Sequence, residues 1–213
     1  MFIINPYLFS SAPLTLTYVN SDIIASATLT LPSGWAAGDL AILMEYLGSS
    51  GAVTLGSPSG WTDIDSVTTL SSYAGRFAYR VLQSGDTNIV TGSTSDEKAT
   101  ALFVYRPSRA IAAVTASSKN KELTAGNPAS QSVAASGLST PALVLALAGA
   151  NGGGLWNFST ASPAFDITPG VDPGNTYMRT GIKLYNSAPS DHTIDMADQG
   201  AGNALMSCAL SIT

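Results

Sequence analysis

Cysteine and histidine are nearly absent from this 213-residue sequence, which contains one of each, Cys208 and His192. A lone cysteine excludes an internal disulfide framework and a cysteine-based zinc site. Cys208 lies in an apolar stretch, where we expect it to act as a small buried hydrophobic side chain. His192 lies in the polar stretch 190–193, where we expect a solvated turn.

Charged side chains are also scarce. They make up 11% of the residues, against roughly 25% in an average soluble domain. The nine Lys and Arg are scattered and the net charge is −5, so we expect no nucleic acid partner, because phosphate binding needs clustered cations. A surface with so few charges opposes association only weakly. This favours a protein partly buried in an assembly, with a monomer as the alternative.

Long hydrophobic runs are missing. The longest aliphatic run, Ala142 to Ala150, is far shorter than the about 20 residues of a transmembrane helix. The first residues, Met1 to Phe9, carry no positive charge on a side chain and are interrupted by Pro6. They do not have the features of a secretory signal. We therefore expect no membrane partner and maturation in a cytoplasm.

Short apolar runs bounded by Gly, Pro, Asp or Ser are frequent instead, and they indicate strands. The run Leu40 to Leu47 is apolar at both its odd and its even positions, which predicts a central strand covered on both faces. Glu45 is the exception in this run and needs a partner. The run Ile24 to Leu31 alternates as a half-buried strand does. No window combines helical periodicity with caps, so we expect an all-β protein.

The second half of the sequence resembles a degenerate copy of the first. Leu40–Met44 matches Ala142–Ala146, and Trp61–Ile64 matches Phe165–Thr168. Three further segments match in the same order at nearly constant spacing, which predicts two half-repeats over about 32–107 and 137–213.

Two architectures fit such a repeat: two small sandwiches side by side, or two half-sandwiches that share one core. No Pro/Gly-rich linker separates the halves. This favours one composite antiparallel β-sandwich of jelly-roll character over residues 14–213.

Residues 1–13 form an arm with many large apolar side chains. Two interpretations stay open: the arm is a first edge strand of its own domain, or it docks on another subunit. In the second case aromatic anchors contribute most to the interface. The candidate assembly contacts are Phe2, Ile3, Ile4, Tyr7, Leu8 and Phe9.

A turn-and-strand pattern in the first half points to a family. It consists of Gly38-Asp39-Leu40 before an apolar strand, Pro58-Ser59-Gly60-Trp61-Thr62, Tyr79-Arg80-Val81, and Gly85-Asp86. This pattern resembles a widespread group of tailed-bacteriophage virion proteins: β-sandwich head decoration, head-fibre and tail-associated proteins. The resemblance covers 32–107 well and 137–213 weakly. It implies a β-sandwich and a structural role, and it transfers no catalytic residues.

Candidate catalytic or metal-binding groups are few. Asp63 and Asp65 flank Ile64, and on a regular strand they would share one face, as in a Ca²⁺ site or a glycosidase. Solvated carboxylates are the favoured interpretation. The sequence has no Gly-x-Ser-x-Gly elbow, because Pro58 occupies the nucleophile position of Gly56–Gly60. We expect no enzyme activity, no cofactor and no metal.

The sequence therefore predicts a non-enzymatic virion structural protein that decorates or cements a phage capsid and is assembled in the host cytoplasm. Its expected partners are further copies of itself, for example in a trimer, and other virion proteins such as the major capsid protein. The alternative is a carbohydrate-binding, receptor-recognition module of a phage fibre or tail. In that case Trp156, just beyond a Gly-rich loop, would stack on a glycan, although a packed loop anchor is the more conservative interpretation of this residue.

Overall fold

The computed structural model is described here for residues 12–26, 28–48, 54–56, 58–68, 73–87, 89–90, 97–124, 130–151, 158–171, 176–196 and 203–213. These residues form fifteen β-strands and no helix, which confirms the predicted all-β class. None of them belongs to a helix with the length and apolarity needed to cross a bilayer.

The first large sheet is antiparallel and has the strand order β1-β7-β3-β5-β4. Every residue of its central strand β3 is buried, which confirms the prediction made from its two apolar parities. The edge strands β1 and β4 carry more polar side chains. The bounds are β1 Leu16–Ile24, β3 Leu40–Gly48, β4 Thr62–Thr68, β5 Tyr73–Val81 and β7 Glu97–Pro107.

The second large sheet, also antiparallel, has the order β12-β13-β10-β15-β8. Its central strand, β10, is apolar on both parities as β3 is. The bounds are β8 Val114–Thr124, β10 Ala142–Asn151, β12 Gly170–Val171, β13 Thr176–Tyr185 and β15 Asn203–Ile212.

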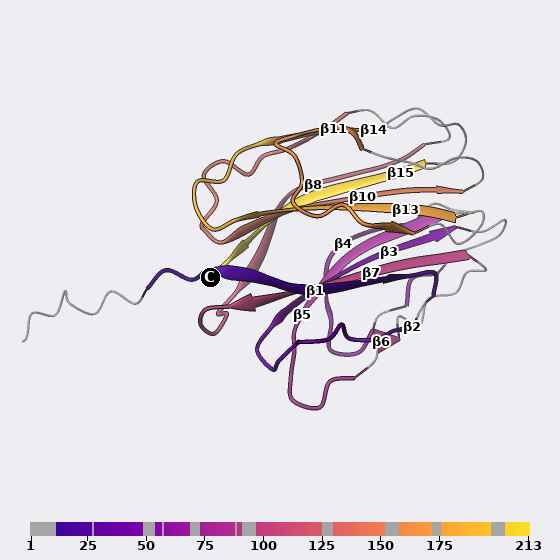
Figure 1. The fold of residues 1–213 in the computed structure, drawn as a ribbon. Coiled ribbons are helices and arrows are strands. Elements are labelled where there is room, and N and C mark those ends of the chain that lie inside the picture. Colours follow the sequence, from indigo (N-terminus) through magenta and orange to yellow (C-terminus); the bar gives the residue numbers. More distant parts are fainter. Residues whose placement is uncertain are drawn as a thin grey trace, which may run out of the picture.

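Two small sheets cover the outer faces of the large ones. β2 (Thr28–Leu29) pairs with β6 (Ile89–Val90), and β14 (His192–Met196) lies between β11 (Phe158–Ser162) and β9 (Gln131–Val133). Figure 1 shows the resulting stack of four layers, with β11 and β14 above the second large sheet and β2 and β6 below the first. The antiparallel β-sandwich prediction is thus confirmed.

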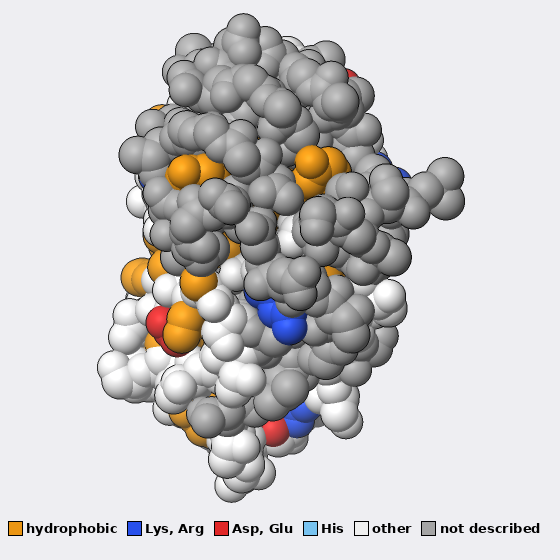
Figure 2. Space-filling model, turned by 90° about the vertical axis from the view of Figure 1, so that its right-hand side faces the viewer, with side chains coloured by type: hydrophobic (Ala, Val, Ile, Leu, Met, Phe, Trp, Pro, Cys, Tyr) orange, Lys and Arg blue, Asp and Glu red, His pale blue; other side chains and the backbone are white. Residues whose placement is uncertain are grey.

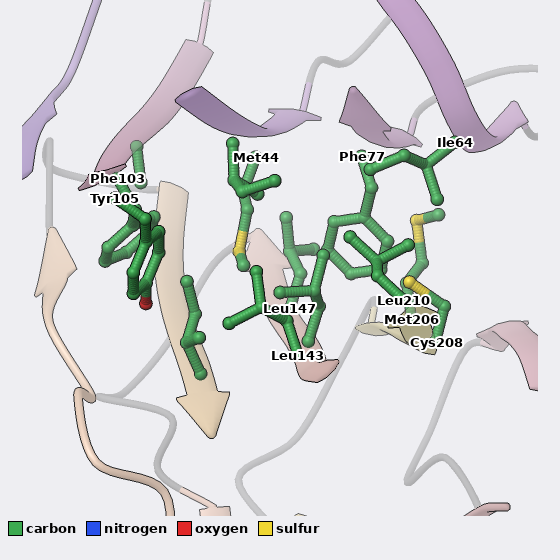
Figure 3. Close-up of a cluster of buried hydrophobic side chains, with 14 of the residues drawn as sticks. Met44, Ile64, Phe77, Phe103, Tyr105, Leu143, Leu147, Met206, Cys208 and Leu210 are labelled. Carbon is green, nitrogen blue, oxygen red and sulfur yellow. The ribbon is translucent and has the colours of Figure 1, made fainter. Parts of the chain in front are cut away.

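The main core lies between the two large sheets, as predicted for halves that share one core. Figure 3 shows Met44, Phe77 and Phe103 of the first sheet pointing toward Leu147 and Met206 of the second. Completely burying one such side chain is worth about 1.5–3 kcal/mol. This shared core therefore holds the two halves together.

Each half also has a smaller core of its own beneath its small sheet. In the first half Leu43 and Leu102 pack with Leu29 of β2. In the second half Val144 and Leu205 pack with residues of β9 and β14. The structure thus combines both predicted architectures: each half has a small sandwich, and the two share the largest core.

The two large sheets have matching strand orders. In each, the first strand of the half pairs with the last, followed by the central strand, then by β5 or β13, and then by a shorter edge strand, β4 or β12. Across the core β1 faces β12 and β4 faces β8, while β3 faces β10. An approximate two-fold axis parallel to the strands, relating one large sheet to the other, would produce this arrangement.

The predicted alignment of the first half with the second pairs side chains that lie on opposite faces of their sheets. It places Ile42 on Val144, but Ile42 faces the shared core and Val144 faces the outer cluster. Matching Leu40 with Leu143 instead puts core-facing residues on core-facing residues. The difference is a single residue, and a one-residue slip reverses every side chain of a strand.

Two predicted strands differ from the structure. Among the described residues of Ile24 to Leu31, Ile24 ends β1 and only Thr28–Leu29 forms a further strand, although Leu29 and Leu31 are buried as the alternation indicated. The stretch Ala110 to Thr115 enters a strand only at Val114. That strand, β8, lies at a sheet edge, where one side is solvated and the apolar pattern is weak.

Candidate functional site

The predicted assembly contacts in the arm and the predicted glycan-stacking Trp156 lie outside the described residues. The residues of the family-like pattern and the sheet edges lie within them. The large sheets meet along two seams, one between β1 and β12 and one between β4 and β8.

The first part of the pattern closes the end of the first sheet through Asp39 and Arg106. The Arg106 Nε lies 3.0 Å from Asp39 Oδ1 and its NH2 lies 2.8 Å from Oδ2, a bidentate pair. Asp39 also accepts the Ala36 N–H at 2.8 Å. The hydrogen bonds and charge of Asp39 raise the pKa of Arg106. The Gly-Asp element is therefore a turn anchor tied to the last strand of the half.

The second part of the pattern is joined by Arg80. Its NH1 donates to the Ser59 carbonyl at 2.8 Å, and its NH2 pairs with Asp86 at 2.6 Å. Gly60 has a φ of +78° and lies against the Arg80 guanidinium, so the turn needs both backbone freedom and the missing side chain. The structure thus brings the pattern residues together in structural contacts.

Glu45 and Arg76 form a buried ion pair on the outer face of the first sheet. Their side chains are 0% and 1% exposed, and the Arg76 NH1 also donates to the Gly56 carbonyl. The predicted need of Glu45 for a partner is confirmed. Asp63 Oδ1 also lies 3.8 Å from the Arg76 NH1. Among the described residues the Glu45 Oε1 and Arg76 Nε have no hydrogen-bond partner, so the pair is only partly satisfied.

His192 is buried, and the expectation of a solvated turn residue is wrong. The ring is stacked on Phe165, and its Nε2 lies 2.7 Å from the Tyr185 hydroxyl, which in turn contacts Ser190 Oγ at 2.9 Å. Burial lowers the pKa of His192, assisted by Lys183. The residue starts β14 in the small sheet, and its ring contacts Phe165 and Tyr185, which no local sequence pattern indicates.

Asp63 and Asp65 do not share a face, contrary to the expectation for a regular strand. A bulge at Ile64 shifts the register, so Asp63 lies opposite Ala78 and Asp65 opposite Phe77, which face opposite clusters. Asp65 pairs with Lys121 at 3.2 Å instead of being solvated. In the described part of the chain, no three His, Cys, Asp or Glu side chains gather closely enough to hold a metal ion.

Cys208 is completely buried in the shared core, which confirms its predicted role as a small hydrophobic side chain. Desolvation raises the pKa of its thiol well above the ordinary value. Since the thiolate is the reactive form, this cysteine is chemically inert in the folded protein.

One seam between the large sheets, at β1 and β12, is closed by a carboxamide. Asn186 accepts the Leu16 N–H at 2.8 Å through Oδ1 and donates to the Leu16 carbonyl at 2.9 Å through Nδ2. The side chain thus pairs with the outer edge of β1 as a neighbouring strand would. Such pairing protects an edge from further strand addition.

The opposite seam, at β4 and β8, is bridged by lysines. Lys119 Nζ donates to the Ile64 carbonyl at 2.5 Å, and Lys121 Nζ donates to the Ser66 carbonyl at 3.0 Å. Next to this bridge lies an open groove of about 270 Å³ between the two strands. Its lining combines apolar and polar side chains: Thr62, Asp63, Ile64, Tyr79, Val114, Thr115, Ala116 and Lys119.

The β8 side of this groove is an unpaired backbone edge. Ala113 exchanges both backbone hydrogen bonds with Thr213. Because such pairs alternate along an antiparallel ladder, the N–H and C=O groups of Val114 and Ala116 point away from β15, toward the groove. No described residue bonds them. Sequence reasoning missed this site, and the only signal for it was the weak apolar pattern of an edge strand.

Figure 2 shows the end of the sandwich toward which β3 and β10 run. Among the described residues of this face, a few Lys, Arg, Asp and Glu side chains are interspersed with hydrophobic and uncharged polar ones.

No family model, no curated protein and no solved structure matches this chain.

Proposed function

We propose that this chain is a non-enzymatic structural protein of a bacteriophage virion, which decorates or cements the capsid. The support from sequence is the resemblance of the 32–107 pattern to tailed-phage virion proteins. The support from structure is that Asp39, Arg80, Asp86 and Arg106 of that region are engaged in turns and ion pairs, as befits a rigid scaffold.

The observation that carries the proposal is the relation between the body and the arm. Both large sheets are covered on both faces, so the body offers mainly edges, ends and loops for binding. The described chain starts beside β1, and Figure 1 places the C-terminus at the same end of the sandwich. The uncharged, apolar arm therefore joins the body at one end, which suits attachment of a rigid body to a lattice.

Attachment through such an arm would be weak per copy and strong on a lattice. Burial of apolar surface contributes about 25 cal/mol per Å², and ordering of the arm offsets part of this gain. Repetition over many sites multiplies the effect through avidity.

The test is binding to capsids of the encoding phage that were prepared without this protein. Full-length protein is expected to co-sediment with them, and a variant lacking residues 1–9 is expected to remain folded and unbound. Equal binding of both proteins would contradict the anchoring role. A glycan array tests the carbohydrate-binding alternative, and a specific signal there without capsid binding would favour a fibre or tail module.

A further inference from the structure

The two seams of the sandwich occupy equivalent positions, but a side chain pairs with the strand edge at only one of them among the described residues. In the alignment of Leu40 with Leu143, which keeps core-facing residues on core-facing residues, Pro107 corresponds to Ile212. Leu16 pairs with Pro107 and Val114 pairs with Ile212, so Leu16 corresponds to Val114. Asn186 occupies the backbone edge at Leu16. At the other seam the corresponding residue, Gln83, turns back to donate to the Val81 carbonyl at 3.0 Å. The edge of β8 is therefore left open where the edge of β1 is filled.

We propose that this open edge of β8 is a strand-acceptor site, and that its occupant is the arm segment Phe2–Asn5 of a neighbouring copy of this chain. The inference rests on the proposed function, in which the arm makes assembly contacts. It adds the position of the contact on the partner.

The backbone chemistry of the edge suits an extended segment. Val114 and Ala116 together present two N–H donors and two C=O acceptors spaced as in a strand, which is the template used in β-augmentation. The Asn186 carboxamide shows that the equivalent position accepts an amide in this geometry. On the arm, Pro6 lacks an N–H and would end the pairing after Asn5.

The side-chain chemistry of the groove also suits the arm. Ile64, Tyr79 and the Val114 side chain provide apolar surface, while Asp63 and Lys119 at the rim offset each other in charge. No Asp, Glu, Lys or Arg occurs in residues 1–13. Burying these side chains therefore desolvates no charged side chain of the arm, and charge desolvation is the largest cost at a partly apolar site.

The position of the arm favours a neighbouring copy over the same chain. The arm joins the body at β1, whereas β8 lies on the opposite edge of the other large sheet. An arm of the same molecule would have to cross four strand spacings of about 4.8 Å and a sheet spacing of about 10 Å, which residues 6–13 could span only when nearly fully extended across the body. A neighbour placed beside β1 presents its groove directly, and the head-to-tail contact closes into a ring or extends along a lattice.

Cysteine cross-linking in the full-length chain tests the proposal. Ile3→Cys combined with Thr115→Cys on β8 is expected to give disulfide-linked dimers and higher oligomers under a mild added oxidant, since buried Cys208 does not compete. The matched control is Ile3→Cys with Thr17→Cys. Thr17 is the exposed residue that corresponds to Thr115 on the edge closed by Asn186, and cross-linking there should be at least tenfold less.

Sedimentation over a range of concentrations gives an independent measurement. Ala116→Pro removes one outward N–H at an edge and should weaken self-association at least tenfold, whereas Ala116→Ser keeps that N–H and should associate as the wild type does. Three results would overturn the proposal: cross-links within one chain only, equal cross-linking at Thr17, or a wild type that stays monomeric. If Ala116→Pro does not fold, the cross-linking comparison decides. Capsid binding without self-association would sink this inference and leave the proposed function standing.

Discussion

Tyr46 of β3 lies directly on Gly149 of β10, across the shared core. A Cβ atom at Gly149 would lie 2.3 Å from Tyr46 Cδ2, well inside van der Waals contact. The two residues correspond in the matching that preserves side-chain facing, so they meet near the approximate two-fold axis. Two identical large side chains would collide there, and one half carries the tyrosine while the other carries no side chain.

Replacing the glycine tests this packing. Gly149→Ala is expected to destabilise the protein by about 1–3 kcal/mol, the usual cost of overpacking a well-filled core. Urea denaturation should show a lower midpoint with an unchanged slope. In the Tyr46→Leu background the same substitution should cost much less, and an equal cost in both backgrounds would contradict direct contact.

Removing one partner of the buried ion pair should be costly. Glu45→Gln leaves the buried Arg76 charge with only the half-exposed Asp63 carboxylate, 3.8 Å from its NH1, and breaking a buried pair typically costs about 3–5 kcal/mol. Replacing both residues, as Glu45→Leu with Arg76→Met, should recover most of this loss, because the uncompensated charge is gone. A double variant that is less stable than Glu45→Gln would show that loss of the ion pair, and not the isolated Arg76 charge, accounts for most of the destabilisation.

Stability should depend on pH through His192. The folded-state pKa of His192 lies below its ordinary value of 6.5, so the unfolded chain binds the extra proton more readily. The His192 contribution is therefore fully present above pH 6.5 and declines as the pH falls below it, by at most about 1.4 kcal/mol per pH unit.

Since His192 is the only histidine, its imidazole signals can be followed directly by NMR titration. The charged and titratable groups around the ring are Tyr185, Lys183, Asp166 and Asp191. His192→Phe should flatten the stability profile between pH 7 and 5. A folded-state pKa at or above 6.5 would refute the assignment.

Opening the closed seam should expose the edge of β1. Asn186→Ala removes both hydrogen bonds to Leu16 and is expected to cost about 1–3 kcal/mol, because a backbone donor and acceptor lose their partner. Hydrogen exchange at the Leu16 amide should accelerate. Gln83→Ala, at the corresponding position of the other half, should have little effect on either measurement.

The two halves are expected to superimpose with Leu40 on Leu143. In a crystal structure, superposition of the two halves in that alignment should give a closer fit than the alternative of Leu40 on Ala142. A better fit in the second alignment would reverse our assignment of corresponding residues, including Leu16 with Val114 and Thr17 with Thr115.

Local pattern alone determined the all-β class, the central position of β3, the burial of Cys208 and the need of Glu45 for a partner. Each follows from the polarity of a residue and its immediate neighbours along a strand, because a strand buried on both faces must be apolar on both parities. The same property explains the alignment error. When β3 and β10 are apolar throughout, no alternation distinguishes one register from the next.

Only the tertiary structure decided the burial of His192, the bulge that separates Asp63 from Asp65, and the contrast between the two seams. These depend on which segments meet across the sandwich: Asn186 reaches Leu16, and Lys119 reaches Ile64, from the opposite half of the chain. A polar side chain in a turn looks the same in the sequence whether it meets water or an unpaired strand edge. What it meets is fixed by the packing of the sheets, which brings residues distant in sequence within hydrogen-bonding distance.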